Sequence, residues 1–291
     1  MTNDESITND PNSNDETAAG AARVFRHSVF GHSSLIRHSS FVIRVSPLRP
    51  AGSETEIPPP DEKAEKEKLP PRRISPELAY ILPMAVFLVL TWAGGQWPAL
   101  YVASYVSKTL ITPLLLIVLW PNYTKIRWTY WWLGAVMGVI GVFQWIGMEK
   151  GLIHLWPNFP EMHAEVFDPT KAFSSSAAFW SFVAVRWAGA SLVVPVMEEL
   201  FWRDFLWRTV AAPADFLAAA IGQWDRGVPL LAVSAAFCLV HPFWLTAFVW
   251  GIMIGLLLAL TRSLGACIVM HAVTNFLLGA YVLWFHDWRF W

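Results

Sequence analysis

The chain has 291 residues, of which 55% are hydrophobic and only 15% are charged, and this composition is too apolar for a soluble domain of this length. The formal net charge of -1 excludes a protein that binds nucleic acid through a concentrated excess of Lys and Arg. The two cysteines, Cys238 and Cys267, both lie in apolar runs, which excludes a disulfide framework.

The first 76 residues differ in composition from the rest of the chain. Asn, Asp, Ser and Thr dominate up to about residue 20, and a stretch rich in Pro and charge runs from Ile57 to Pro76. Such segments cannot bury enough apolar surface to fold, so we expect residues 1–76 to form a disordered polar tail. The tail lacks the apolar core and the cleavage site of a secretory signal.

Residues 77–291 are predicted to form an all-α, polytopic membrane helix bundle. Apolar stretches recur at about the 20-residue length needed to cross a hydrocarbon core of roughly 30 Å, and backbone exposed to lipid must be helical. The stretches are 78–96, 99–120, 131–148, 178–202, 228–241, 243–261 and 264–285. The break at His241-Pro242 leaves open two short helices or one kinked helix, so we expect seven or eight transmembrane helices.

Flanking charge predicts the orientation of the bundle in the bilayer. Basic residues lie before the first span and in the second loop: Lys63, Lys66, Lys68, Arg72, Arg73, Lys125 and Arg127. Because cytoplasmic loops carry an excess of Lys and Arg, the N-terminus is expected in the cytoplasm. We expect an integral multi-pass protein of the plasma membrane.

The fourth apolar stretch contains two adjacent carboxylates and an arginine, Glu198-Glu199-x-x-x-Arg203. Ionisable groups inside a membrane are costly and usually face a cavity where they carry function. Glu199 and Arg203 are four residues apart on one helical face and can pair, which leaves Glu198 available as a base. Pro195, just upstream, is expected to kink the helix and free backbone carbonyls. The structural alternative is a solvated charge cluster where the helix leaves the membrane.

Two further stretches carry polar residues at helical spacing. Phe237-x-x-x-His241 places an imidazole one turn after an aromatic ring, and His271-x-x-x-Asn275 places an imidazole and an amide on one face. Each pattern alone is more typical of a satisfied core residue. Three polar clusters on three apolar stretches are most economically explained by one hydrated site. Glutamate and histidine are suited to general acid–base catalysis, and Asn and His can donate hydrogen bonds to an oxyanion, which together favour a hydrolase that activates water.

These three motifs, in this order on successive apolar stretches, resemble the CAAX protease and bacteriocin-processing family of glutamic intramembrane endopeptidases. The resemblance covers about residues 178–285. It implies that Glu198 with His241 activates the hydrolytic water and that His271 with Asn275 stabilises the oxyanion. It further implies that Glu199 and Arg203 shape the site, as Phe237 does beside His241. The implied partner is a membrane-associated protein or peptide, cleaved near a lipidated or C-terminal segment, and no cofactor or metal is implied.

Other classes of function remain open at this point. A zinc metallopeptidase could use Glu198, His241 and His271 as ligands, although the His-Glu-x-x-His signature is absent. A proton-coupled transport protein or a non-catalytic membrane scaffold or immunity protein could also keep buried Glu and His residues. An inverted repeat, which would favour a transporter, is not evident.

Some features inside the spans receive structural interpretations only. Gly134 and Gly138 have the four-residue spacing that lets two helices pack closely in lipid. Arg186 lies about 18 Å along the helix axis from Glu198 at 1.5 Å per residue, which is too far for a direct role. We expect Arg186 to snorkel or to pair locally, and the same interpretation applies to Lys108.

Overall fold

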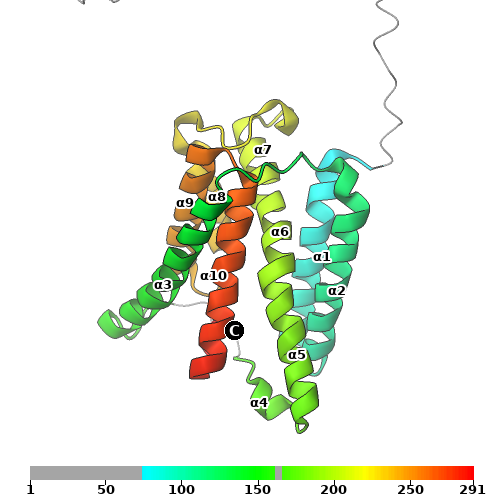
Figure 1. Ribbon diagram of the computed structural model, residues 1–291, viewed down its shortest axis with the longest axis vertical. Helices are drawn as coiled ribbons and strands as arrows, with labels where there is room; N and C mark the ends of the chain where they lie inside the picture. The colour runs from blue at the N-terminus through cyan, green and yellow to red at the C-terminus, as the bar shows by residue number, and fades with distance from the viewer. Residues whose placement is uncertain (1–73, 161–165) are drawn as a thin grey trace, which may run out of the picture. The chain divides into compact units, whose positions relative to one another are not determined.

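The computed structural model describes residues 74–160 and 166–291, and all regular secondary structure in these ranges is helical (Figure 1). The predicted all-α membrane bundle is thereby confirmed. The polar tail predicted over residues 1–76 lies outside the described residues except for its last three, so its disorder stays a prediction.

Six helical segments in the described part of the chain are long and apolar enough to cross a bilayer. They are α1 (Pro76–Gln96), η1 to η2 (Pro98–Asn122) with α2 (Tyr101–Leu119) at its centre, α3 (Trp131–Leu155), the segment from α5 (Ser176–Ala188) to α7 (Trp207–Ala211), α9 (Trp244–Thr261) and α10 (Leu264–Phe285). Large apolar side chains such as Phe143, Leu260 and Trp284 are exposed on the outside of these helices, as expected in contact with lipid.

We expected seven or eight crossings, but residues 74–160 and 166–291 contain six candidate spans, and the difference from seven is due to one helix. The apolar stretch predicted over 228–241 forms α8 (Val228–Cys238), which has only 11 residues. At 1.5 Å per residue it is about 16 Å long, roughly half of the hydrocarbon thickness. The chain turns at residues 239–243 and then enters α9, so His241 lies in a turn rather than in a helix. The remaining short elements are α4 (Pro169–Ala172), η5 (Phe216–Ala218), η6 (Asp225–Gly227) and η7 (Trp288–Phe290).

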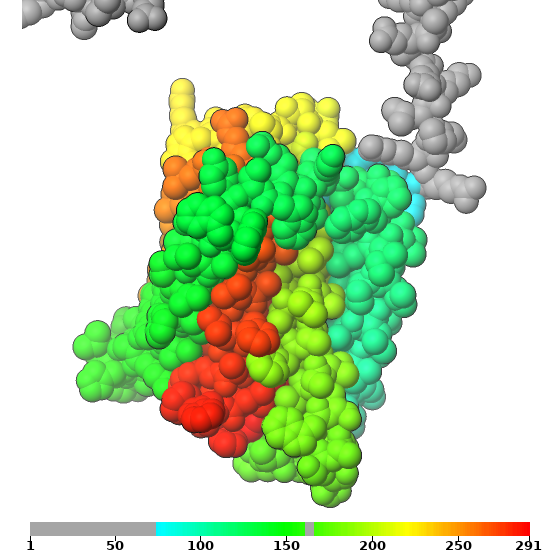
Figure 2. Space-filling model, in the orientation of Figure 1, coloured from blue at the N-terminus to red at the C-terminus, as the bar shows by residue number. Residues whose placement is uncertain are grey.

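Close packing of α3 on α10 holds the helix that carries His271. Figure 2 shows α10, in red, between α3 in green and the yellow-green α5–α6 segment. A Cβ atom added to Gly138 would lie 2.7 Å from the Met270 carbonyl oxygen, and one added to Gly141 would lie 2.7 Å from Thr274 Oγ1. Thr274 Oγ1 donates to the Gly138 carbonyl at 3.0 Å. The packing role predicted for Gly134 and Gly138 is therefore confirmed.

A buried polar cluster ties α7 to α1 and to the loop that follows α2. Arg208 Nη1 lies 2.7 Å from Asp204 Oδ1, and the Tyr80 hydroxyl donates to Asp204 Oδ2 at 2.7 Å. Arg208 also donates to Thr124 Oγ1 and to the carbonyls of Leu217 and Ala219. Because every one of these buried charges has hydrogen-bond partners, the cluster fixes the end of the helix that carries the two glutamates.

Candidate active site

The segment from residue 176 to 211 contains two π-helical turns on either side of Glu198 and Glu199. The first is η3 (Gly189–Val193), the second is η4 (Leu200–Leu206), and α6 (Val194–Glu199) lies between them. Single π-turns inside α-helices occur frequently at functional sites because they rotate the side chains that follow. The sequence patterns did not predict them.

Pro195 explains how the first π-turn contributes to the site. In this turn the Val194 N–H donates to the Gly189 carbonyl five residues earlier. The next donor in the π pattern would be the amide of residue 195, but proline has no N–H, so the Ala190 carbonyl is left without its helical partner. Asn275 Nδ2 of α10 donates to this carbonyl at 2.9 Å. The expectation that Pro195 frees a backbone carbonyl near the site is confirmed.

Glu198 is a buried carboxylate that faces a cavity. Its exposed fraction is 6%, and its Oε2 atom has no hydrogen-bond partner among the residues that the structure describes. A buried carboxylate oxygen without a partner is costly unless water or a ligand occupies the space beside it. This environment is consistent with the predicted role of Glu198 as a group that binds water or substrate, and the role itself stays a prediction.

Glu199 has a different environment from its neighbour. Its Oε1 atom lies 2.8 Å from His271 Nδ1 and accepts a hydrogen bond from Arg203 Nη1 at 3.3 Å. Arg203 is also held over the rings of Phe237 and Trp250. The pairing of Glu199 with Arg203 was expected from their spacing, but the contact with His271 joins residues 72 positions apart and was not predicted.

The two imidazoles are oriented by different partners. His241 Nδ1 lies 2.8 Å from the Phe237 carbonyl oxygen, and a carbonyl can only accept. Nδ1 therefore carries a proton, and in the neutral imidazole the lone pair lies on Nε2. The rings of Phe237 and His241 are 4.2 Å apart, so Phe237 positions His241 with both its ring and its backbone. His271 Nδ1 lies 2.8 Å from the Glu199 carboxylate, which fixes the orientation of the imidazole ring.

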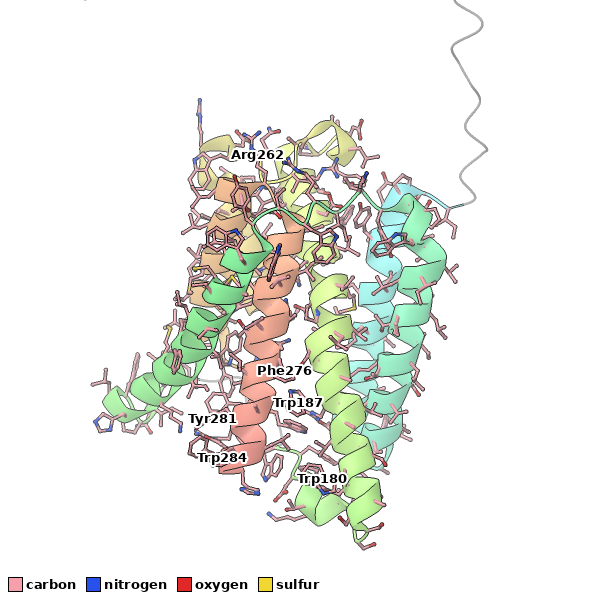
Figure 3. The ribbon with its side chains drawn as sticks, in the orientation of Figure 1. Trp180, Trp187, Arg262, Phe276, Tyr281 and Trp284 are labelled. Carbon is pink, nitrogen blue, oxygen red and sulfur yellow. The ribbon has the colours of Figure 1, made fainter. Side chains whose placement is uncertain are left out.

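One cavity of about 230 Å³ brings together all four residues predicted to be catalytic. Glu198, His241, His271 and Asn275 line it, together with Phe237. Its wall between α5 and α10 is formed by Trp187, which stacks on Phe276 at 4.8 Å and donates to the Phe276 carbonyl (Figure 3). The four residues therefore line one cavity, as expected from the motifs, while their catalytic roles stay a prediction.

The cavity also contains residues that motif reasoning missed. Tyr105, Trp145 and Trp250 line it, and Tyr105 and Trp145 belong to α2 and α3, which the family resemblance does not cover. Arg186 lines it as well, so the interpretation of this residue as too distant for the site needs correction. Arg186 and Glu198 lie about 18 Å apart along the helix axis, but the cavity extends along the helix and is lined by both residues.

The polar side chains of the cavity are not arranged as the ligands of one metal ion. Among the described residues, no three His, Cys, Asp or Glu side chains lie close enough to hold a metal ion together. His271 uses Nδ1 for Glu199, and His241 uses Nδ1 for a backbone carbonyl. The arrangement suits two imidazoles that face a bound water and substrate from separate elements.

Comparison with known protein families supports the resemblance derived from the motifs. Residues 179–277 match the family model described as type II CAAX prenyl endopeptidase Rce1-like, and this range contains Glu198, His241, His271 and Asn275. The family predicted from the motifs is thereby confirmed for this range. No curated protein and no solved structure gives a significant match to the chain.

Proposed function

We propose that this integral membrane protein, whose residues 179–277 match the Rce1-like type II CAAX prenyl endopeptidase family, hydrolyses a peptide bond of a membrane-associated substrate with water activated by Glu198 and His241. The single observation that carries this proposal is the shared cavity, in which a partnerless carboxylate oxygen of Glu198 lies with two imidazoles and an amide. Such a set matches the needs of amide hydrolysis without a covalent intermediate.

In the proposed mechanism Glu198 accepts a proton from water while His241 Nε2 accepts the second hydrogen bond of that water. The hydroxide attacks the scissile carbonyl carbon, and the negative charge develops on the carbonyl oxygen. His271, oriented by Glu199, donates from Nε2 to this oxygen. The Asn275 amide keeps one N–H on Ala190 and has a second N–H for the same oxygen. Glu198 then returns its proton to the leaving amine, which completes hydrolysis.

We propose that the protein lies in the plasma membrane with its N-terminus in the cytoplasm. Figure 1 shows the start of α1 at the same end of the bundle as the 123–130 loop. The exposed Lys125 and Arg127 lie in that loop, which supports a cytoplasmic location for it. Reaction of single cysteines placed at residues 125 and 171 with a membrane-impermeant thiol reagent tests this orientation, since only the second should react in intact cells.

The experiment that tests the proposed activity compares carboxy termini in membranes from cells that produce the wild-type protein or Glu198→Gln. We expect a set of shortened carboxy termini that depends on Glu198, because the amide of glutamine cannot accept the proton from water. Glu77→Gln, which changes an exposed carboxylate at the start of α1, serves as the control and should process the same proteins. Unchanged processing by a folded Glu198→Gln protein would reject the mechanism and favour a scaffold or transport function.

A further inference from the structure

A second cavity, called the outer cavity below, lies beside the active-site cavity. Its volume is about 920 Å³, and its walls include Gln96 at the end of α1 and Lys171 of α4, both of which are exposed. Lys171 pairs with Asp168, which also lines this cavity, at 3.4 Å. Figure 1 shows α4 at the end of the bundle opposite the start of α1. The outer cavity therefore reaches the surface of the protein at this end of the helices.

Three side chains form the boundary between the two cavities. Tyr105, Arg186 and Trp291 line both of them. The guanidinium carbon of Arg186 lies 4.6 Å from the centroid of the Tyr105 ring and 5.0 Å from that of the Trp291 ring. A guanidinium at such distances from aromatic rings is attracted to them by cation–π interaction. The residues that separate the cavities are thus held in place by contacts with one another.

Trp291 belongs to a short segment that follows α10. His286 has a left-handed backbone conformation with φ 56°, which ends the helix and turns the chain. Residues 287–291, called the strap below, contain the single turn η7. Phe290 of the strap is 8% exposed, and its ring lies 5.4 Å from that of Phe243, in the turn that carries His241. The strap therefore lies against the active-site cavity, which its last three residues line.

The contacts that hold Trp291 and the base of the strap are weak. Trp291 Nε1 is buried and has no hydrogen-bond partner in the part of the chain that the structure describes. A buried N–H without a partner has given up its bond to water, and this cost opposes the gain from the cation–π contact with Arg186. At the base of the strap, Asp287 lies 3.9 Å from Lys150, whose side chain is half exposed, and such a pair contributes little. A small change in free energy is therefore enough to displace Trp291.

We propose that the strap is a gate, in which Trp291 resting on Arg186 closes the passage between the outer cavity and the active site. Displacement of Trp291 joins the two cavities and lets water reach Glu198. Hydrolysis consumes one water molecule for each peptide bond, and the hydrocarbon core around the helices supplies none. Ser104 and Lys108 give the outer cavity polar walls that water can solvate. The inference rests on the proposed function only for the use that Glu198 makes of the water.

The test measures how fast a water-soluble thiol reagent reaches each cavity. Val194 lines the active-site cavity one helical turn before Glu198, and Ser104 lines the outer cavity. Each is changed to cysteine in the full-length protein in which Cys238 and Cys267 are replaced by alanine. The probe is 2-sulfonatoethyl methanethiosulfonate, applied to the protein in lipid nanodiscs, and labelling is followed by mass spectrometry. Because a minor open state is populated at about 0.1 to 10%, Val194→Cys should react about tenfold or more slowly than Ser104→Cys.

Substitutions of Trp291 distinguish a gate from a general barrier. Trp291→Ala removes the ring from Arg186 and should speed the labelling of Val194→Cys by about tenfold or more, with that of Ser104→Cys unchanged. Trp291→Phe keeps an aromatic face for the guanidinium and should leave the labelling of Val194→Cys slow. The control is Trp284→Ala on α10, because Trp284 is 80% exposed and lines neither cavity. It should leave both rates unchanged.

Arg186→Gln removes the other partner of the same contact and should also speed the labelling of Val194→Cys. The double variant Trp291→Ala/Arg186→Gln should react no faster than either single variant, because both changes break one interaction. If Arg186→Gln does not fold, the comparison of Trp291→Ala with Trp291→Phe carries the test. Equal labelling of Val194→Cys with and without Trp291→Ala overturns the gate, and so does an equal acceleration by Trp284→Ala.

The labelling rates separate the gate from the proposed activity, because they are measured without substrate. Acceleration by Trp291→Ala supports the gate even when no protein is processed in a Glu198-dependent manner. Conversely, Glu198-dependent processing by a protein whose Val194→Cys labelling is unaffected by Trp291→Ala supports the activity and rejects the gate.

Discussion

His271 of α10 and Glu199 of α6 are in contact at 2.8 Å between Nδ1 and Oε1, inside a site where the neighbouring Glu198 keeps a carboxylate oxygen without a partner among the described residues. Two adjacent glutamates thus differ in their surroundings. Glu199 is held between an imidazole and a guanidinium, while Glu198 faces the cavity. This difference supports the proposal that Glu199 positions His271 and that Glu198 takes part in the reaction.

Replacement of Glu199 by glutamine should lower kcat by about 10² to 10⁴-fold, because the carboxylate that orients the His271 imidazole is lost. It should also destabilise the protein by about 3 to 5 kcal/mol, since Arg203 is left as an uncompensated buried charge. The double variant Glu199→Gln/Arg203→Gln should recover much of that stability and none of the activity. Activity per folded molecule and thermal unfolding in detergent check the two effects, and recovery of both together would contradict the assignment.

Asp204→Asn provides the contrasting case of a buried ion pair away from the cavity. Asp204 pairs with Arg208 at 2.7 Å, and neither residue lines the active-site cavity. We expect a loss of about 3 to 5 kcal/mol in the free energy of unfolding, because Arg208 loses its counter-ion. The kcat of the protein that remains folded should change by less than about threefold. Because a tenfold change in rate corresponds to about 1.4 kcal/mol, this is a change of well under 1 kcal/mol in the activation free energy. Turnover rates normalised to the folded fraction are the measurement, and a fall like that of Glu199→Gln would be the contrary result.

Pro195→Ala should reduce activity without reducing stability. The new N–H at residue 195 can donate to the Ala190 carbonyl, which competes with Asn275 Nδ2 for the same acceptor. Asn275 would then lose the contact that orients its amide, and we expect kcat to fall about tenfold or more. Steady-state kinetics with thermal unfolding in parallel distinguish this effect from misfolding. A variant with wild-type kcat would show that the freed carbonyl has no part in positioning Asn275.

Gly138→Ala should destabilise the contact between α3 and α10. The added Cβ would lie 2.7 Å from both the Met270 carbonyl oxygen and Val273 Cβ, so the two helices must move apart. We expect a cost of about 1 to 3 kcal/mol. Gly147→Ala in the same helix is the control, because a Cβ there meets nothing within 4 Å and should stabilise by about 0.5 to 1 kcal/mol. Unfolding in mixed micelles, monitored by tryptophan fluorescence, should give opposite signs for the two variants.

The membrane fold was predictable from the sequence, and so was the set of polar residues that line one cavity, because both depend on local patterns. Span length follows from hydropathy, and each four-residue motif places its members on one helical face. One error concerned α8, where continuous apolar composition hid the end of the helix at Cys238. Hydropathy records which residues prefer lipid, but it does not record where the backbone turns.

The sequence by itself predicted a membrane bundle in which Glu198, His241, His271 and Asn275 come together, and it predicted the pairing of Glu199 with Arg203. Only the tertiary structure decided that Glu199 contacts His271, that Asn275 caps the carbonyl freed by Pro195, and that Arg186 shares the cavity with Glu198. The physical reason is that these contacts join different helices or follow a cavity, and their geometry is set by how α3, α6 and α10 pack rather than by the spacing of residues along any one of them.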